Sequence, residues 1–270
     1  MSKQPDPLER RIQRGAVAHY EDAIYYDLAY RRRRQDVGFY VELAKAHGGP
    51  VLELGVGSGR VALATARAGI EVVGIEAVPA MLAQARSSAE RLLPHGARDR
   101  LTLRKGDIRR FALGRKFGLI TAPFNVFMHL YSRSDVERTL RCVQNHLTPR
   151  GRLVFDVIMP DLRAMTRSKG HLYRGPSITH PSTGTHYEYF EAFEYDAVRQ
   201  VQMVSMVFQN SADPSDTKSS PLSQRQFLPQ ELEALLHYNG FAIESLWGTF
   251  DRKPLTGDCE SQILVVKARR

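Results

Sequence analysis

Residues 51–60 read Val51-Leu52-Glu53-Leu54-Gly55-Val56-Gly57-Ser58-Gly59-Arg60. The run from Val51 to Leu54 is typical of a buried strand, and the glycines after it predict a sharp turn into a helix that begins near Arg60. Alternate glycines leave no side chain between the backbone and a ligand, and the amide groups at the start of the helix point to the same place. The stretch therefore predicts a strand, a ligand-binding turn and a helix.

Two kinds of ligand suit such a turn. A dinucleotide site takes the pattern G-x-G-x-x-G. Starting at Gly55, the sequence does not match this pattern, because Arg60 stands where the third glycine is needed. Residues 57–62 match the looser pattern that ends in alanine. The acidic Glu53 and the G-x-G-x-G spacing after it favour the other ligand. Residues 53–59 resemble the first motif of the class I S-adenosylmethionine-dependent methyltransferases, written E/D-x-G-x-G-x-G.

Length and composition fit an ordinary globular protein. The 270 residues, 43% hydrophobic and 25% charged, are enough for one large α/β domain with a small insertion. No apolar run approaches the ~20 residues that span a bilayer, and the N-terminus offers no apolar signal segment, so we expect a cytoplasmic protein away from membranes. Cys142 and Cys259 have no metal-ligand spacing, so no metal is expected.

The net charge of +9 raises the question of an acidic partner such as nucleic acid. The arginines, however, are scattered, and only residues 31–34 form a run, which we expect to be a solvated helix face with one member turned inward. No basic stripe is interleaved with stacking aromatic residues, and no RNA-binding module is recognisable. We therefore do not expect a nucleic-acid partner, and a homodimer is a possible assembly.

Strand and helix patterns alternate along most of the chain. Expected helices lie at residues 37–47, 61–68, 79–93, 134–147 and 229–239, and expected strands at 51–54, 71–75, 101–104, 117–121, 151–157, 241–249 and 263–267. Such alternation predicts an α/β fold with a seven-stranded, mostly parallel sheet, helices on both faces and an antiparallel last strand. The resemblance implies the same Rossmann-like core.

The pattern departs from this alternation at residues 161–221. Two extended runs, 186–195 and 200–208, and a polar loop after them predict a small antiparallel β insertion that serves as a substrate cap. The core would then comprise residues 49–160 and 222–270. Residues 1–48 would form an N-terminal lid segment and a helix, with a mobile tail up to about residue 15.

Cofactor-binding residues are expected where the strands end. Glu76 closes the second strand, 17 residues after Gly59, and a carboxylate there can accept both ribose hydroxyls of an adenosine. By resemblance, Asp107 accepts from the adenine amine, the Ile108 amide reaches the ring, and N-terminal tyrosines with Arg33 close over the cofactor. The implied cofactor-binding set is Tyr20, Tyr26, Arg33, Glu53, Gly55, Gly57, Gly59, Glu76, Ala77, Met81, Asp107, Ile108, Pro123 and Phe124.

The methyl group would be presented after the fourth strand. Methylases of exocyclic amines in DNA carry (N/D)-P-P-(Y/F) there, whereas this chain has Ala-Pro-Phe-Asn over residues 122–125. The order Asn125-x-x-x-His129-Leu130 is instead similar to that of glycine and amino-sugar N-methyltransferases. If a helix begins there, Asn125 and His129 share one face, and His129 can act as a base. A purely structural His129 remains the alternative.

The acceptor pocket has no motif of its own. Catalytic roles are predicted for His129 and Asn125, and substrate contacts for Tyr30, Asn125, Tyr187 and Tyr189. The aromatic residues of the insertion, His180, Phe190 and Phe193 among them, suit either a partly apolar pocket or an ordinary β core.

Together these features predict an S-adenosylmethionine-dependent methyltransferase that acts on a small molecule or peptide in specialised metabolism. Transfer to nitrogen is favoured over transfer to oxygen, and S-adenosylhomocysteine is the expected product. The alternatives are a methyltransferase of RNA or protein, a non-catalytic binder of adenosyl ligands, and an NAD(P)-binding oxidoreductase.

Overall fold

The computed structural model describes residues 6–30 and 32–269, which divide into two compact units. The core unit comprises Arg32–Met159 and Phe227–Arg270, and the insertion unit comprises Met1–Arg31 and Pro160–Gln226. Each unit is therefore assembled from two separate stretches of the chain.

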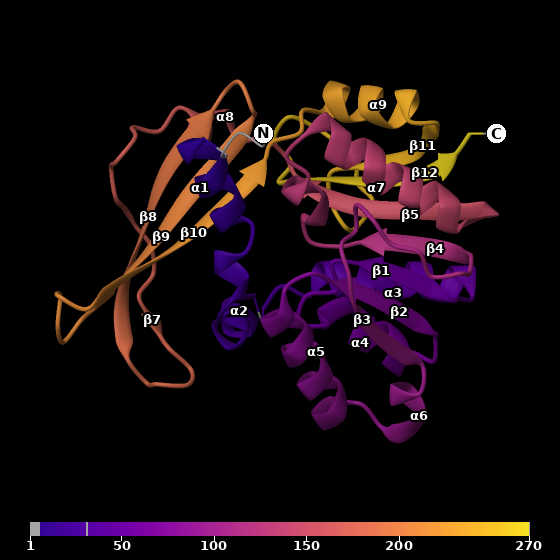
Figure 1. The fold of residues 1–270 in the computed structure, drawn as a ribbon, viewed down its shortest axis with the longest axis horizontal. Helices are drawn as coiled ribbons and strands as arrows, with labels where there is room; N and C mark the ends of the chain where they lie inside the picture. Colours follow the sequence, from indigo (N-terminus) through magenta and orange to yellow (C-terminus); the bar gives the residue numbers. More distant parts are fainter. Residues whose placement is uncertain (1–5, 31, 270) are drawn as a thin grey trace, which may run out of the picture. The chain divides into compact units, whose positions relative to one another are not determined.

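A seven-stranded sheet forms the centre of the core unit, in the order β11-β12-β5-β4-β1-β2-β3 (Figure 1). The first five strands in sequence pair in parallel, and β12 runs antiparallel to both of its neighbours. The strands are β1 (Val51–Leu54), β2 (Val72–Glu76), β3 (Leu101–Lys105), β4 (Phe117–Ala122), β5 (Leu147–Ile158), β11 (Phe241–Trp247) and β12 (Ser261–Ala268). The predicted sheet, mostly parallel with an antiparallel last strand, is confirmed.

Helices pack on both faces of this sheet. They are α3 (Gln35–His47), α4 (Arg60–Arg67), α5 (Pro79–Leu92), α6 (His95–Arg98), α7 (Arg133–His146) and α9 (Pro229–Tyr238), with the 3-10 helix η2 (Val126–His129). Phe39 and Tyr40 of α3 are buried in one cluster with Val51 of β1. Successive strand residues point to opposite faces, and the next residue, Leu52, is buried in a cluster with α7 and α9.

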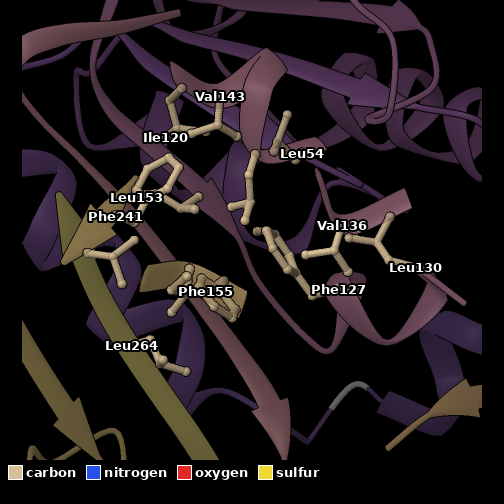
Figure 2. Close-up of a cluster of buried hydrophobic side chains, with 14 of the residues drawn as sticks. Leu54, Ile120, Phe127, Leu130, Val136, Val143, Leu153, Phe155, Phe241 and Leu264 are labelled. Atoms are coloured by element: carbon tan, nitrogen blue, oxygen red, sulfur yellow. The ribbon is translucent and has the colours of Figure 1, made fainter. Parts of the chain in front are cut away.

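The larger of these clusters forms the main hydrophobic core (Figure 2). Phe127 of η2 stacks on Phe155 of β5, with ring centroids 4.2 Å apart. Around them the side chains of Leu54, Val136 and Leu264 come from β1, α7 and β12 (Figure 2). The turn that follows β4 is therefore anchored in the core through η2.

The helix boundaries follow the local sequence. Pro79 occupies the first turn of α5, and Gly48, with φ +76°, ends α3 in a left-handed conformation. Ser132 and Asp135 form a capping box at the start of α7, each side chain bonding to the other's backbone amide.

The insertion unit contains an antiparallel sheet in the order β10-β9-β8-β6, with β7 also paired to β8. Its elements are α8 (Leu162–Met165), β6 (Tyr173–Arg174), β7 (Ile178–Thr179), β8 (His186–Asp196), β9 (Val201–Asn210) and β10 (Thr217–Arg225). The two long strands were expected, but β10, which begins where the polar loop expected at residues 211–217 ends, was not. As β10 pairs only with β9, an edge position tolerates Pro221. Residues 222–226 thus belong to the insertion unit rather than to the core.

The N-terminal stretch of the insertion unit holds α1 (Pro7–Gly15), the 3-10 helix η1 (Ala18–Tyr20) and α2 (Ala23–Tyr30). The mobile tail expected up to residue 15 is therefore wrong from Pro7 onward; residues 1–5 lie outside the described residues. Asp6 caps α1, Ile12 is 1% exposed, and a side chain at Gly15 would meet the Ser223 amide of β10. The expected boundary at residue 48 also moves, because α3 packs on the core sheet.

Within residues 6–30 and 32–269, no helix is long and apolar enough to cross a membrane.

Candidate active site

The glycine turn after β1 has a backbone that only glycine adopts readily. Gly55, Gly57 and Gly59 have φ of +65°, +58° and +91°, all left-handed. A Cβ on Gly55 would lie 2.6 Å from Val126 Cγ2, so the turn after β4 packs directly against the glycine turn. The turn therefore presents backbone rather than side chains at the carboxyl end of β1.

Glu53 lies at the end of β1, beneath this turn, and is only 2% exposed. Burial raises the pKa of Glu53 to about 8, although the Arg60 guanidinium and a hydrogen bond from the Ala62 amide oppose the shift. Because Ala62 lies in the first turn of α4, this bond ties Glu53 to the start of the helix. The acidic residue of the motif thus supports the turn from inside.

Glu76 ends β2 with its carboxylate held by two backbone amides. Gly57 donates to Oε2 at 2.9 Å and Val78 donates to Oε1 at 2.8 Å. The side chain is 7% exposed, and burial raises its pKa despite these bonds. The carboxylate is therefore fixed against the glycine turn, where the sequence placed a ribose-binding group.

Asp107 follows β3 and forms an ion pair that the sequence did not indicate. The Arg109 guanidinium donates to both oxygens, with Nε–Oδ1 at 2.9 Å and Nη2–Oδ2 at 2.8 Å. Burial alone would raise the pKa of Asp107, but the bonds from Arg109 outweigh it and lower the pKa. An adenine amine at this site would share the carboxylate with Arg109. The next residue, Ile108, packs against the main core.

Two arginines lie against the ring of Phe124. The guanidinium carbons of Arg33 and Arg60 are 4.7 and 4.9 Å from the ring centroid. Arg60 Nη2 donates to Asp36 Oδ2 at 2.5 Å, and Arg33 Nε lies 3.9 Å from the same oxygen. Asp36 is 1% exposed, so two cations share one buried carboxylate. The expected helix face is wrong for residues 32–34, which lie between α2 and α3; among these three, Arg33 is the half-buried one.

The segment after β4 carries unusual backbone geometry. Phe124 and Asn125 have φ of +63° and +68°, a left-handed conformation that side chains disfavour. Asn125 is 5% exposed, and its Oδ1 is buried without a hydrogen-bond partner among the described residues. His129 Nδ1 lies 3.1 Å from the Tyr131 hydroxyl.

The expected α-helix that would place Asn125 and His129 on one face does not form. The helix is a four-residue 3-10 helix, and Asn125 stands outside it as the N-cap. With three residues per turn, positions four apart do not align.

A buried pair that the sequence analysis missed supports the same segment. Tyr40 of α3 donates its hydroxyl to Asp156 Oδ1 at 2.7 Å, and the Phe124 amide donates to the same oxygen at 2.8 Å. Asp156 is fully buried in β5. The one signal in the sequence was an acidic residue inside the apolar run over residues 153–158.

The remaining predicted residues of the core unit lie in the same region. Met81 is buried with its Cε 3.4 Å from where a Gly57 Cβ would stand, Pro123 is buried, and Ala77 is exposed directly after Glu76. These residues, the glycine turn, Glu76, Asp107 and Phe124 all follow the carboxyl ends of β1, β2, β3 and β4, which are adjacent in the sheet. Ligands of open α/β sheets bind at such strand ends.

In the insertion unit, the N-terminal tyrosines gather around one histidine. The rings of Tyr20, Tyr26 and Tyr30 lie 5.2, 5.6 and 5.8 Å from that of His19, whose Nε2 is 3.0 Å from the Tyr30 hydroxyl. Burial lowers the pKa of His19 to about 4, so the ring is neutral near pH 7. The three predicted tyrosines therefore belong to one packed aromatic cluster.

The two tyrosines predicted on β8 have different surroundings. Tyr189 donates to Glu191 Oε1 at 2.6 Å, whereas Tyr187 is 5% exposed and accepts from Lys218 Nζ at 3.0 Å. Phe208 of β9 packs against Tyr189, with ring centroids 5.2 Å apart.

Among residues 6–30 and 32–269, no group of three or more His, Cys, Asp or Glu side chains is placed to hold a metal ion.

Comparison with known families identifies the core unit. Residues 51–151, from β1 into β5, match the model of a methyltransferase domain. This part of the chain is therefore similar to a methyltransferase domain. The resemblance inferred from residues 53–59 is confirmed, since the matched stretch contains this motif.

Solved methyltransferase structures share the fold of the whole chain. The CcbJ methyltransferase from Streptomyces caelestis is 22% identical, with a TM-score of 0.78 over 94% of this chain and 99% of that one. The amino pentose methyltransferase CalS10 from Micromonospora echinaspora, with bound S-adenosylmethionine, is 21% identical (TM-score 0.60, all of both chains). The glycopeptide N-methyltransferase MtfA in complex with S-adenosylmethionine is 22% identical (TM-score 0.59, 86% and 94%). No curated protein matches the sequence.

Proposed function

We propose that this methyltransferase transfers a methyl group from S-adenosylmethionine to a nitrogen of a small molecule or peptide. The observation that carries the proposal is the placement of the Glu76 carboxylate, which the Gly57 and Val78 amides hold at the edge of the glycine turn. A rigid acceptor beside open backbone suits a ribose with two hydroxyls.

The residues fit an adenosyl cofactor from end to end. Glu76 would accept from the ribose, and Asp107 and the Ile108 amide would face the adenine. At the other side of the turn, Arg33 would bind the carboxylate of the cofactor's amino-acid half. Asp36 carries one negative charge and faces both Arg33 and Arg60, so it leaves positive charge over for this ligand group. A side chain on Gly55, Gly57 or Gly59 would be strained because all three have positive φ, and a Cβ on Gly55 or Gly59 would also clash with Val126 or Leu63.

S-adenosylmethionine supplies a methyl group made electrophilic by a sulfonium, so the protein's main task is to orient the acceptor. The turn of Phe124 and Asn125 lies beside the glycine turn, and the buried Asn125 amide oxygen can accept from an amine N–H. His129, at the end of the same segment, would act as the base that takes a proton from the acceptor.

A nitrogen acceptor is supported by two observations. The Asn125-x-x-x-His129 spacing is similar to that of N-methyltransferases, and MtfA and CalS10 are named for glycopeptide and amino pentose substrates. The absence of the D-P-P-Y type of motif from residues 122–125 argues against amines of DNA as acceptors. The aromatic side chains of the insertion unit, Tyr30, Tyr187 and Tyr189 among them, are proposed to contact the acceptor.

Ligand-dependent thermal unfolding tests the cofactor. A ligand present at a hundredfold excess over its Kd should stabilise the native protein by about 2.7 kcal/mol. We expect a shift with S-adenosylhomocysteine and S-adenosylmethionine and none with NAD or NADP. Glu76→Ala should lose the shift, whereas Glu71→Ala, at the exposed start of the same strand region, should keep it. A shift with NAD alone would overturn the proposal.

Release of S-adenosylhomocysteine from S-adenosylmethionine tests the acceptor. We would screen amino sugars, amino acids and short peptides, each beside the analogue in which a hydroxyl replaces the amine. Turnover confined to the amines would support transfer to nitrogen. A loss of activity in His129→Ala that high pH partly restores would support His129 as the base. Turnover only with the hydroxyl analogues, or only with RNA, would contradict it.

A further inference from the structure

Asp156 is a carboxylate where the fold needs none. It stands in β5 between Phe155 and Val157, which pack in the main core, and it is 0% exposed. Burial raises its pKa, although the bonds from Tyr40 and the Phe124 amide oppose the shift. Because a buried carboxyl group costs more to desolvate than an apolar side chain, a role beyond stability is indicated.

The contacts of Asp156 point to that role. Its Oδ1 accepts from the Phe124 amide at 2.8 Å, and the Tyr40 hydroxyl fixes the same oxygen at 2.7 Å. Phe124 and Asn125 are the two successive left-handed residues, each costing about 1–2 kcal/mol to hold in that conformation. Asp156 therefore holds the strained turn at its first residue.

The surroundings of this turn are unusually polar for a sheet interior. Thr121 Oγ1, Asn125 Oδ1 and Asp156 Oδ2 are all buried without a hydrogen-bond partner among the described residues. Thr121 lies on β4, Asn125 in the turn after β4, and Asp156 on β5. Unsatisfied buried groups are rare in packed cores and mark places where geometry serves a site.

The turn belongs to one half of the proposed cofactor site. Sheet order places β4 on one side of β1, and β2 and β3, with Glu76 and Asp107, on the other. Val126, directly after the turn, packs against Gly55, and the Phe124 ring carries the Arg33 guanidinium. In the proposed function the adenosine half of the ligand would lie over β2 and β3, and the amino-acid half would lie toward the turn.

We propose that Asp156 and Tyr40 form a buried positioning pair that sets the Phe124–Asn125 turn and thereby the binding of the amino-acid half of the cofactor. The proposal rests on the proposed function, because it assumes that the site binds an adenosyl ligand. It assigns these two residues no contact with the ligand itself.

Calorimetry with S-adenosylhomocysteine and with adenosine separates the two halves of the site. Asp156→Ala should raise the Kd for S-adenosylhomocysteine about tenfold and change the Kd for adenosine by less than about twofold. Asp156→Asn keeps an oxygen that can accept from both donors, so it should restore most of the affinity. Tyr40→Phe removes only a hydroxyl and should raise the Kd for S-adenosylhomocysteine about threefold, again without effect on the Kd for adenosine. This variant tests the same proposal if Asp156→Ala does not fold.

A matched control distinguishes positioning from general damage. His146 is also buried in the core unit and accepts from a backbone amide, that of Leu113 at 3.0 Å. His146→Leu should lower stability and leave both affinities unchanged. Equal weakening of both ligands by Asp156→Ala, no weakening of either, or no rescue by Asp156→Asn would overturn the proposal. A wild-type protein that binds neither ligand would instead overturn the proposed function.

Discussion

Replacing Gly57 by alanine would separate the backbone strain of the glycine turn from its role in binding. Gly57 has φ +58°, and a Cβ there would meet nothing closer than Met81 Cε at 3.4 Å, an ordinary contact. The cost to folding is therefore that of a left-handed alanine, about 1–2 kcal/mol. In the proposed site the same methyl group stands where the cofactor approaches the backbone.

Gly114 provides the matched control. It has φ +67°, is exposed in the connection between β3 and β4, and its Cβ would meet nothing within 4 Å. Gly114→Ala should therefore lose the same ~1–2 kcal/mol as Gly57→Ala, measured by urea unfolding. Only Gly57→Ala should raise the Kd for S-adenosylhomocysteine, by about tenfold or more, or at least ~1.4 kcal/mol by calorimetry. Unchanged binding in Gly57→Ala, or equal losses in both variants, would refute the placement of the cofactor against this turn.

Three further variants test the electrostatics and the capping. The pKa of His19 is lowered to about 4 in the folded state, so the free energy of unfolding should fall as pH drops from 6.5 to about 4. The slope should approach about 1.4 kcal/mol per pH unit. His19→Gln should lack this slope in acid-melting curves. The pKa of Glu53 is raised from 4.5 to about 8, so its contribution to stability is complete below pH 4.5 and is lost as pH rises to about 8. Glu53→Gln should therefore gain stability relative to wild type across that window. Unfolding can be followed by the fluorescence of Trp247 in β11. Ser132→Ala removes half of the capping box of α7 and should cost about 1 kcal/mol in urea unfolding.

Each of these variants has an outcome that would contradict its reasoning. A His19→Gln protein with the wild-type acid slope would place the titrating group elsewhere. A Glu53→Gln protein less stable than wild type by the same margin at pH 4.5 and pH 8 would show that Glu53 is not protonated in the folded state. For the cap, the control is Ser134→Ala, on the exposed first turn of α7. Equal losses of stability in Ser132→Ala and Ser134→Ala would show that the capping box does not stabilise the helix.

The sequence predicted those parts of the fold that depend on local pattern. Buried strands such as Val51–Leu54, with helices closed by Gly48 and Gly240, appear where periodicity and stop residues placed them. Strand β10 was missed because its serines and Pro221 carry no β signal, and only its pairing with β9 makes it a strand. The α1 helix was missed for a similar reason, since its single buried apolar side chain, Ile12, packs on a sheet made much later in the chain.

In the candidate site, the sequence predicted features that depend on a local motif, such as the turn from Gly55 to Gly59, and on the end of a strand, such as Glu76. The supporting contacts could not be predicted, because they join distant segments. Asp36 meets Arg60 across 24 residues, and Tyr40 meets Asp156 across 116. Nothing near Tyr40 in the sequence distinguishes a positioning hydroxyl from an ordinary buried tyrosine.

The bond between Ser223 and α1 has a consequence for synthesis of the protein on the ribosome. The Ser223 hydroxyl donates to the Ile12 carbonyl at 2.6 Å, across 211 residues. At about 5–20 residues per second, roughly ten to forty seconds separate the emergence of α1 from that of the strand it packs on. Throughout that interval the Ile12 face lacks the strand that covers it in the folded protein, so α1 cannot dock until most of the chain has been made.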